Sequence, residues 1–228
     1  MQNVTAVAHR GDPYRLRENT IASLRSALDL GADAVECDVR LTRDGVPVLL
    51  HDATLKRLWG QDRPLASLSA AEVRGLTAGA VPTLAEALAA TEGSRLMLDL
   101  PGTREAGTAR RIVDAVREAG AADRVYYCAG AVAMLAVRAA DPSAEIALTC
   151  TSLAPPRPAL LAAVKPRWLN YRFSLVDRDL AARVHRDGHL LSVWTPDTRR
   201  SLRRLVGLGV DSITTNRIDL LTALRKEG

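Results

Sequence analysis

The stretch that decides the fold is AVECDVRLTRDGVPVLLH, residues 34–51. Ala34–Leu41 is an apolar run typical of a buried strand, and Pro47–His51 is a second run of the same kind. The pair Asp44-Gly45 between them is a hairpin signal. We therefore expect the chain to turn back here in a short antiparallel excursion.

On either side of this stretch, short apolar runs alternate with segments of helical periodicity, which predicts repeated βα units around a parallel sheet. The expected strands are Val4–His9, Ala34–Leu41 leading to Pro47–His51, Leu96–Leu100, Val125–Cys128, Glu145–Cys150, Trp168–Tyr171, Leu190–Thr195 and Ser212–Thr215. The expected helices include Thr20–Leu30, Thr103–Ala119, Arg178–Asp187 and Thr198–Leu208. When the second and third runs count as one strand region, eight βα units result. The expected fold is therefore α/β, a closed (β/α)8 TIM barrel.

Residues 52–80 depart from a plain βα repeat. They form a polar connection with an expected helix at Ala70–Leu76, and Pro82-Thr83 starts another helix. We expect a short loop-and-helix insertion over the barrel mouth, because the segment is too short to bury a core of its own. Residues 1–228 are accordingly expected to form a single TIM-barrel domain.

The composition argues against several classes of partner. The 228 residues include 31 Lys and Arg against 26 Asp and Glu, a net charge of +5, with the arginines scattered along expected helices. Aromatic residues make up only 4%, so base stacking is poorly supported and no nucleic-acid partner is expected. No uninterrupted apolar stretch is long enough to cross a bilayer, so no stable membrane insertion is expected. The expected partner is a small anionic substrate, and no feature specifies an oligomeric state.

The three cysteines, Cys37, Cys128 and Cys150, are widely spaced and lie in apolar strand-like segments. Their spacing is not that of a zinc site, so we expect buried free thiols. No basic-then-apolar leader opens the sequence, and the expected location is the cytoplasm.

Acidic residues occupy the carboxyl ends of expected strands, where the loops of a barrel converge and carry its chemistry. Glu36 and Asp38 are two residues apart on one strand and point to the same face, and Asp99 ends another strand. Carboxylates that face a barrel interior are unfavourable without a cation or protons between them. Oxygen ligands without thiols favour a hard cation, so Mg²⁺ or Ca²⁺ is expected. A solvent-facing polar stripe is the alternative explanation for the first two acids.

Two histidines, His9 and His51, lie at the ends of expected strands. They would form an acid/base pair, because imidazole ionises close to neutral pH. Either ring could instead be a structural hydrogen-bonding group, His51 through its neighbour Asp52. Together with the acids, the histidines supply the groups required for metal-assisted cleavage of a phosphate ester.

Three further residues are candidates for contact with substrate. Arg10 could bind a phosphate oxygen through charge-assisted hydrogen bonds, or form an ordinary ion pair with a nearby acid. Glu18 could face the metal site, or belong to the start of the first helix, whose expected N-cap is Asn19. Trp194 could cover the carbon face of a small alcohol or be a core tryptophan.

Taken in order, these motifs resemble the glycerophosphodiester phosphodiesterase family. The matching stretches are His9-Arg10-Gly11, Glu18-Asn19-Thr20, Gly31-Ala32-Asp33, Glu36-x-Asp38-Val39, Asp44-Gly45, Pro47-Val48, His51-Asp52, Val193-Trp194-Thr195 and Gly209-Val210-Asp211. Their ordered combination is far more specific than any one of them. The resemblance implies a TIM-barrel enzyme that hydrolyses glycerophosphodiesters to glycerol 3-phosphate and an alcohol with a bound divalent cation.

The resemblance also implies a role for each matching residue. Glu36 and Asp38 would be metal ligands, as Asp99 could be from another strand. His9 and His51 would be the acid/base pair. Arg10 would hold the phosphate.

The chain departs from the family at one strand end. The family usually presents Glu-Ile-Lys there, whereas this chain has Asp99-Leu100-Pro101. Asp99 can still bind a cation, but Pro101 removes a positive charge whose loss can reduce transition-state stabilisation by roughly a few kcal/mol. A barrel that binds a phosphate ester with weak or no catalysis is therefore one alternative.

A phosphodiesterase directed at lysophospholipids, closing the phosphate into a ring, is another alternative. Such an enzyme would need an exposed apolar rim for the acyl chain. Leu55, Leu58 and Trp59 in the insertion could supply that rim. Packing of the insertion onto the barrel is the preferred explanation of these three residues.

Overall fold

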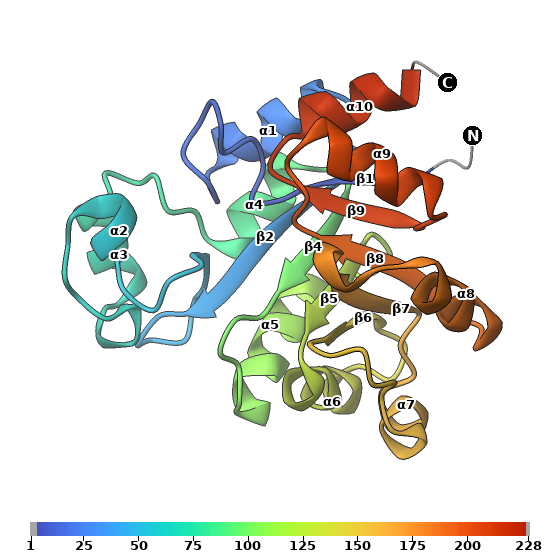
Figure 1. The fold of residues 1–228 in the computed structure, drawn as a ribbon. Coiled ribbons are helices and arrows are strands. Elements are labelled where there is room, and N and C mark those ends of the chain that lie inside the picture. The colour runs from blue at the N-terminus through green and yellow to red at the C-terminus, as the bar shows by residue number, and fades with distance from the viewer. Residues whose placement is uncertain (1–3, 227–228) are drawn as a thin grey trace.

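The computed structural model of the protein describes residues 4–226. Its centre is a closed barrel of eight parallel strands (Figure 1). The barrel strands are β1 (Thr5–Ala8), β2 (Ala34–Leu41), β4 (Arg95–Asp99), β5 (Val125–Ala129), β6 (Glu145–Cys150), β7 (Trp168–Arg172), β8 (Leu190–Trp194) and β9 (Ser212–Thr215). The barrel closes because β1 pairs with β9 on one side and with β2 on the other. The (β/α)8 barrel expected from the sequence is confirmed.

Helices cover the outside of the barrel, as the spacing of their apolar residues predicts. They are α1 (Ile21–Asp29), α4 (Leu84–Ala90), α5 (Ala106–Glu118), α6 (Ala131–Ala140), α7 (Pro158–Val164), α8 (Arg178–Arg186), α9 (Arg199–Gly207) and α10 (Ile218–Lys226). Their buried faces and the outer faces of the strands form the main hydrophobic core. Within residues 4–226, no helix is both long and apolar enough to span a membrane.

The two faces of each barrel strand have different roles, which β2 illustrates. Val35, Cys37 and Val39 point outward into the core beneath the helices. Ala34 belongs to a separate apolar cluster that includes Met97, Tyr126 and Trp168 from other barrel strands. In strand geometry, alternation then sends Glu36 and Asp38 to the same side as Ala34. Cys37, Cys128 and Cys150 are all free and buried, as expected.

The insertion lies to one side of the barrel, beyond the carboxyl end of β2 (left in Figure 1). It contains β3 (Pro47–Leu49), α2 (Lys56–Trp59), a 3-10 turn at Leu65–Ser67 and α3 (Ala70–Leu76). β3 pairs antiparallel with β2, which confirms the hairpin at Asp44-Gly45.

The expectation that the insertion buries no core was wrong. Seven of its residues form a small apolar cluster, with Val48, Leu55 and Leu65 among them, and Trp59 packs against it. The guanidinium of Arg17 covers the Trp59 ring at 4.2 Å from its centroid. Leu55 is fully buried and Trp59 packs against the cluster, as the packing explanation predicts for these two residues, whereas Leu58 is half-buried.

Gly11 allows the loop after β1 to fold closely against α1. Its φ is +87°, and a Cβ at this position would lie 2.6 Å from the carbonyl oxygen of Ser23. Only a residue without a side chain fits this conformation and this space. The loop that carries His9 and Arg10 therefore depends on this glycine.

We expect Gly11→Ala to lower the free energy of unfolding by about 3 kcal/mol, through left-handed strain and a backbone clash. Gly120→Ala is the matched control, because Gly120 also has a positive φ but nothing lies within 4 Å of the added Cβ. In the control, the free energy of unfolding should fall by only about 1 kcal/mol. Urea unfolding of both variants measures the difference, and equal losses would contradict the packing argument.

Candidate active site

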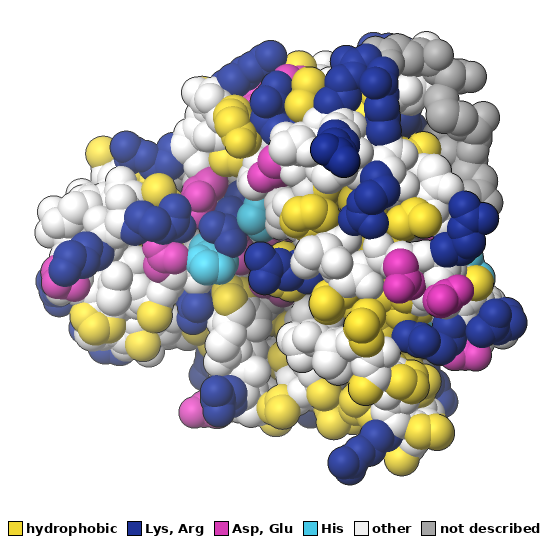
Figure 2. All heavy atoms as spheres, viewed as in Figure 1, with side chains coloured by type: hydrophobic (Ala, Val, Ile, Leu, Met, Phe, Trp, Pro, Cys, Tyr) yellow, Lys and Arg dark blue, Asp and Glu magenta, His cyan; other side chains and the backbone are white. Residues whose placement is uncertain are grey.

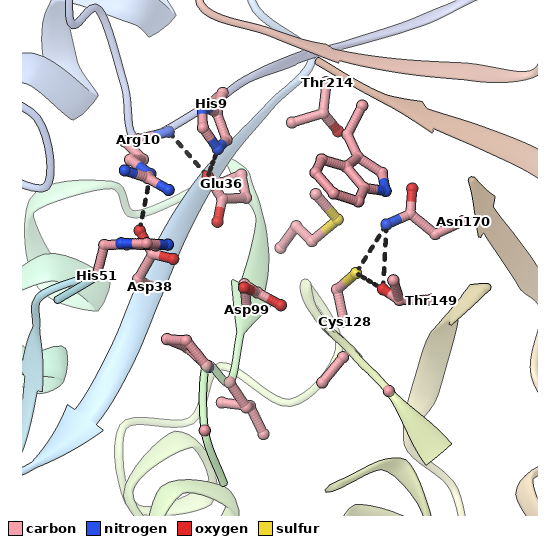
Figure 3. Close-up of a pocket in the computed structure, with 17 residues that line it drawn as sticks. His9, Arg10, Glu36, Asp38, His51, Asp99, Cys128, Thr149, Asn170 and Thr214 are labelled. Atoms are coloured by element: carbon pink, nitrogen blue, oxygen red, sulfur yellow. Dashed lines mark hydrogen bonds and ion pairs between the residues drawn. The ribbon is translucent and has the colours of Figure 1, made fainter. Parts of the chain in front are cut away.

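A cavity of about 320 Å³ opens at the carboxyl ends of the barrel strands. In Figure 2, histidine side chains reach the surface in a hollow between the insertion and the barrel, surrounded by basic and acidic side chains. The cavity has two unlike halves (Figure 3). The charged half is lined by His9, Arg10, Glu36, Asp38, His51 and Asp99. The uncharged half is lined mainly by residues of β5 to β9.

The three acids expected from the sequence meet in the charged half. Glu36, Asp38 and Asp99 each offer a carboxylate oxygen, and these oxygens all lie within 4.8 Å of one another. The register of the barrel brings them together, since Asp38 on β2 is the direct partner of Asp99 on β4. Glu36 is 2% exposed and Asp38 is 1% exposed, so the alternative of a solvent-facing stripe does not apply.

Burial and mutual repulsion act strongly on these carboxyl groups. Burial, followed by the charges of Asp38 and Asp99, raises the pKa of Glu36 well above its ordinary value. Burial, with the charge of Asp38 second, raises the pKa of Asp99 to about 7. A divalent cation would remove both penalties, and an all-oxygen donor set fits a hard cation. The residues present therefore fit the expected metal.

Arg10 follows β1 in a left-handed conformation, with φ at 57°. Its backbone N–H donates to Glu36 Oε2 at 2.9 Å, and its Nη1 donates to Glu18 Oε1 at 3.0 Å. Its Nε lies 3.0 Å from Asp38 Oδ2, at an angle that makes an ion pair but no hydrogen bond. Arg10 is thus both paired with acids and exposed to the cavity, so the two explanations offered for it coexist.

Glu18 contacts arginines. It accepts hydrogen bonds from Arg57 Nη1 and Nη2 at 3.1 and 2.6 Å, in addition to the one from Arg10. Burial alone would raise its pKa, but the hydrogen bonds from Arg57 and the charge of Arg10 lower the pKa overall. An ionised Glu18 therefore fixes Arg10 and links the barrel to the insertion.

The expectation that Asn19 caps the first helix was wrong. Thr20 is the N-cap of α1 and accepts from the backbone N–H of Ser23. Asn19, in a left-handed conformation with φ at 56°, donates from Nδ2 to Asp38 Oδ2 at 2.8 Å and accepts from the Asp38 backbone N–H at 3.1 Å. Asn19 thereby orients Asp38. The sequence did not reveal this role, because Asn19 precedes a helix and is a residue type typical of an N-cap.

His9 is fixed by a chain of hydrogen bonds that the sequence did not reveal. Asn216 Nδ2 donates to Asp197 Oδ2 at 2.7 Å, so its Oδ1 faces His9 Nδ1 at 2.7 Å. An amide oxygen only accepts, and Nδ1 of His9 must therefore carry the proton. The other nitrogen, Nε2, lies 3.9 Å from Glu36 Oε2. Burial, followed by the charge of Arg10, lowers the pKa of His9.

His51 lies after β3 and has a charged partner. Its Nδ1 is 2.8 Å from Asp52 Oδ1, and Asp52 in turn accepts from Arg57 Nε at 2.6 Å. The hydrogen bond from Arg57 is the main cause of the lowered pKa of Asp52, so this carboxylate is ionised.

Trp194 also lines the cavity, at the end of β8, and is not part of the core.

Comparison with known proteins agrees with this geometry. Residues 9–220 match the model of the glycerophosphoryl diester phosphodiesterase family. The chain belongs to this family. Membership confirms the resemblance seen in the sequence and the class of enzyme that it implied.

Several relatives extend over nearly the whole chain, among them the following two. A glycerophosphodiester phosphodiesterase from Caldanaerobacter subterraneus subsp. tengcongensis is 28% identical, with 97% of this chain and 98% of the relative covered. A Mycobacterium tuberculosis protein named "Probable glycerophosphodiester phosphodiesterase 2" is 30% identical, with coverage of 95% and 88%.

Solved structures show the same fold. A phosphodiesterase from Oleispira antarctica, in complex with its product sn-glycerol 3-phosphate, superposes with a TM-score of 0.89 at 22% identity and covers 97% of this chain and 96% of its own. A glycerophosphodiester phosphodiesterase from Thermotoga maritima has a TM-score of 0.85 at 20% identity, with coverage of 99% and 100%.

The raised pKa of Asp99 predicts a pH-dependent stability. Its ordinary value is near 3.8 and its folded value is about 7, so the folded protein binds more protons between these limits. Without metal, stability should therefore fall by roughly 3 kcal/mol as pH rises from about 4 to about 7. A bound cation replaces the protons, so added Mg²⁺ or Ca²⁺ should raise Tm more at pH 8 than at pH 5.

Thermal melts in EDTA and in each metal, from pH 4.5 to 8.5, measure this effect. Asp99→Asn should reduce the fall of Tm with rising pH in EDTA, leaving the part due to Glu36, and should abolish the rise of Tm on addition of metal. Asp123→Asn, which removes an exposed acid on the same chain, should change neither. A metal response that survives in Asp99→Asn would remove Asp99 from the ligand set.

Proposed function

We propose that this protein hydrolyses glycerophosphodiesters to glycerol 3-phosphate and an alcohol with Mg²⁺ or Ca²⁺ held by Glu36, Asp38 and Asp99. The observation that carries the proposal is the meeting of these three buried carboxylates beside two histidines in one cavity. When bound, the cation would neutralise the acids and polarise a phosphate oxygen. The product complex of the Oleispira antarctica protein and the names of the relatives support this substrate class.

The histidines have different partners, which suits them to different tasks. A neutral amide holds His9, and its lowered pKa keeps Nε2 unprotonated near neutral pH. We therefore assign His9 as the base that accepts a proton from the glycerol 2-hydroxyl or from water. The Asp52 carboxylate at Nδ1 of His51 complements a positive charge on that ring. His51 is then the acid that gives its Nε2 proton to the departing alcohol.

Arg10 is assigned to the phosphate. It lines the cavity between the acids and the histidines, and Glu18 holds its guanidinium in place. The double contact between Glu18 and Arg57 anchors this arrangement to the insertion. The role of Glu18 in substrate binding is thus to position Arg10.

We also propose a cytoplasmic location, which three free thiols favour.

Release of glycerol 3-phosphate from a panel of glycerophosphodiesters, with and without EDTA, tests the activity. We expect metal-dependent release by the wild type. His9→Ala and His51→Ala should each lower kcat about 100-fold to 10,000-fold, because each removes a proton-transfer group. His185→Ala is the control, since His185 pairs with Asp211 on the outside of the barrel. An unchanged kcat in either active-site variant would refute its assignment, and circular dichroism checks that the variants fold.

Arg40 is relevant to the alternative in which the protein binds a phosphate ester without cleaving it, because Pro101 replaces a basic residue. Pro101 lines the cavity without a charge. Arg40, at the end of β2, donates from Nε to the His51 carbonyl at 2.8 Å, and its Nη1 would be 3.3 Å from a Cβ at Gly102. The charges of Asp38, Asp52 and Asp99 act on Arg40, which makes no ion pair within 4.0 Å among those of residues 4–226. We propose that Arg40 supplies positive charge on this side of the cavity.

Arg40→Met should lower kcat/KM about 100-fold, because it keeps the aliphatic stem and removes the charge. Arg43→Met, which removes a charge paired with Glu72 at 3.0 Å on the insertion side, is the matched control and should have little effect. Steady-state kinetics with one glycerophosphodiester distinguishes the two. If Arg40→Met retains wild-type kcat/KM, the charge at this position has no part in catalysis.

A further inference from the structure

The uncharged half of the cavity carries polar side chains that the proposed mechanism does not use. These residues, which we name the polar wall, are Cys128, Thr149, Asn170, Trp194 and Thr214. They come from five neighbouring strands, β5 to β9. In Figure 3, Cys128, Thr149, Asn170 and Thr214 lie across the cavity from the acids and histidines. Asn170 is 4% exposed and Thr214 is 1% exposed. Such burial of an amide and a hydroxyl is unfavourable unless they find hydrogen-bond partners.

Several polar atoms of the wall have no partner within the protein. Across residues 4–226, five buried side-chain nitrogen or oxygen atoms make no hydrogen bond. Three of the five belong to the polar wall, namely Asn170 Oδ1, Trp194 Nε1 and Thr214 Oγ1, whereas a fourth, Arg10 Nε, already forms an ion pair with Asp38. Because buried polar groups are nearly always paired, their concentration here indicates atoms whose partner is a ligand.

The orientation of Asn170 makes the wall specific. Its Nδ2 donates to Cys128 Sγ at 3.2 Å and to Thr149 Oγ1 at 3.3 Å. These two contacts fix the amide plane and turn Oδ1 away from both residues (Figure 3). The wall therefore presents an acceptor, Asn170 Oδ1, together with a donor, Trp194 Nε1, and Thr214 Oγ1, which can act as either.

A hydroxyl is the group that satisfies both kinds of atom, because it donates one hydrogen bond and accepts others. We infer that the polar wall binds the free terminal hydroxyl of the glycerol in the substrate. The inference rests on the proposed function, which places the phosphate at Arg10 and gives the 2-hydroxyl to the reaction. An acyl or methyl group at the terminal position would leave the buried atoms unpaired, so the wall selects a glycerol with its terminal hydroxyl free.

Binding of two phosphates that differ by this one hydroxyl tests the inference. Isothermal titration calorimetry, in saturating Mg²⁺ and in saturating Ca²⁺, would compare sn-glycerol 3-phosphate with propane-1,2-diol 1-phosphate. We expect the wild type to bind the glycerol compound about 10-fold to 100-fold more tightly. Asn170→Leu and Thr214→Val should each reduce this preference at least about threefold. Thr77→Val, which removes a buried hydroxyl from the insertion, should keep it.

An equal preference in the wild type and in both wall variants would overturn the inference, as would the absence of any preference or of binding in the wild type. The proposed function fails separately. If the protein binds with the expected preference but releases no glycerol 3-phosphate from any diester, the proposed activity is refuted and the inference about the polar wall stands. If the protein hydrolyses diesters but does not prefer sn-glycerol 3-phosphate, only the inference about the polar wall is refuted.

Discussion

Repulsion between three carboxylates in a buried site is the constraint around which the rest of the molecule is arranged. In a low dielectric, like charges this close cannot all ionise without a compensating cation. The barrel register sets the spacing of Asp38 and Asp99, and the backbone of Arg10 together with Asn19 fixes two of the acids by hydrogen bonds. The rigid strands therefore hold a charge arrangement that the free chain would never adopt.

Much of the fold could be predicted, because burial on both faces of a parallel strand leaves a strong mark on the sequence. The eight barrel strands and the hairpin follow from apolar runs and from Asp44-Gly45. The core of the insertion could not be predicted, because its apolar residues come from a short strand, a 3-10 turn, a short helix and the loops between them, and they share no common period. Asn19 was misjudged for a similar reason, since a short polar residue before a helix usually caps it.

The residues of the charged half of the site could also be predicted, since they fall at strand ends inside recognisable motifs. The residues that hold the site's side chains in place by hydrogen bonds could not be predicted. The bond between His9 and Asn216 joins positions 207 residues apart, and Asn170 reaches Cys128 across 42 residues. Contacts of this kind depend on how far each strand is shifted against its neighbour, and no local pattern records that shift.

Closure of the barrel makes the site depend on its last strand. β1 lies between β2 and β9, and Asn216 directly follows β9. A polypeptide that stops before β9 lacks both the strand that completes the ring and the amide that contacts His9 Nδ1. The histidine at position 9 would then be unoriented, so the ring must close before the site can form.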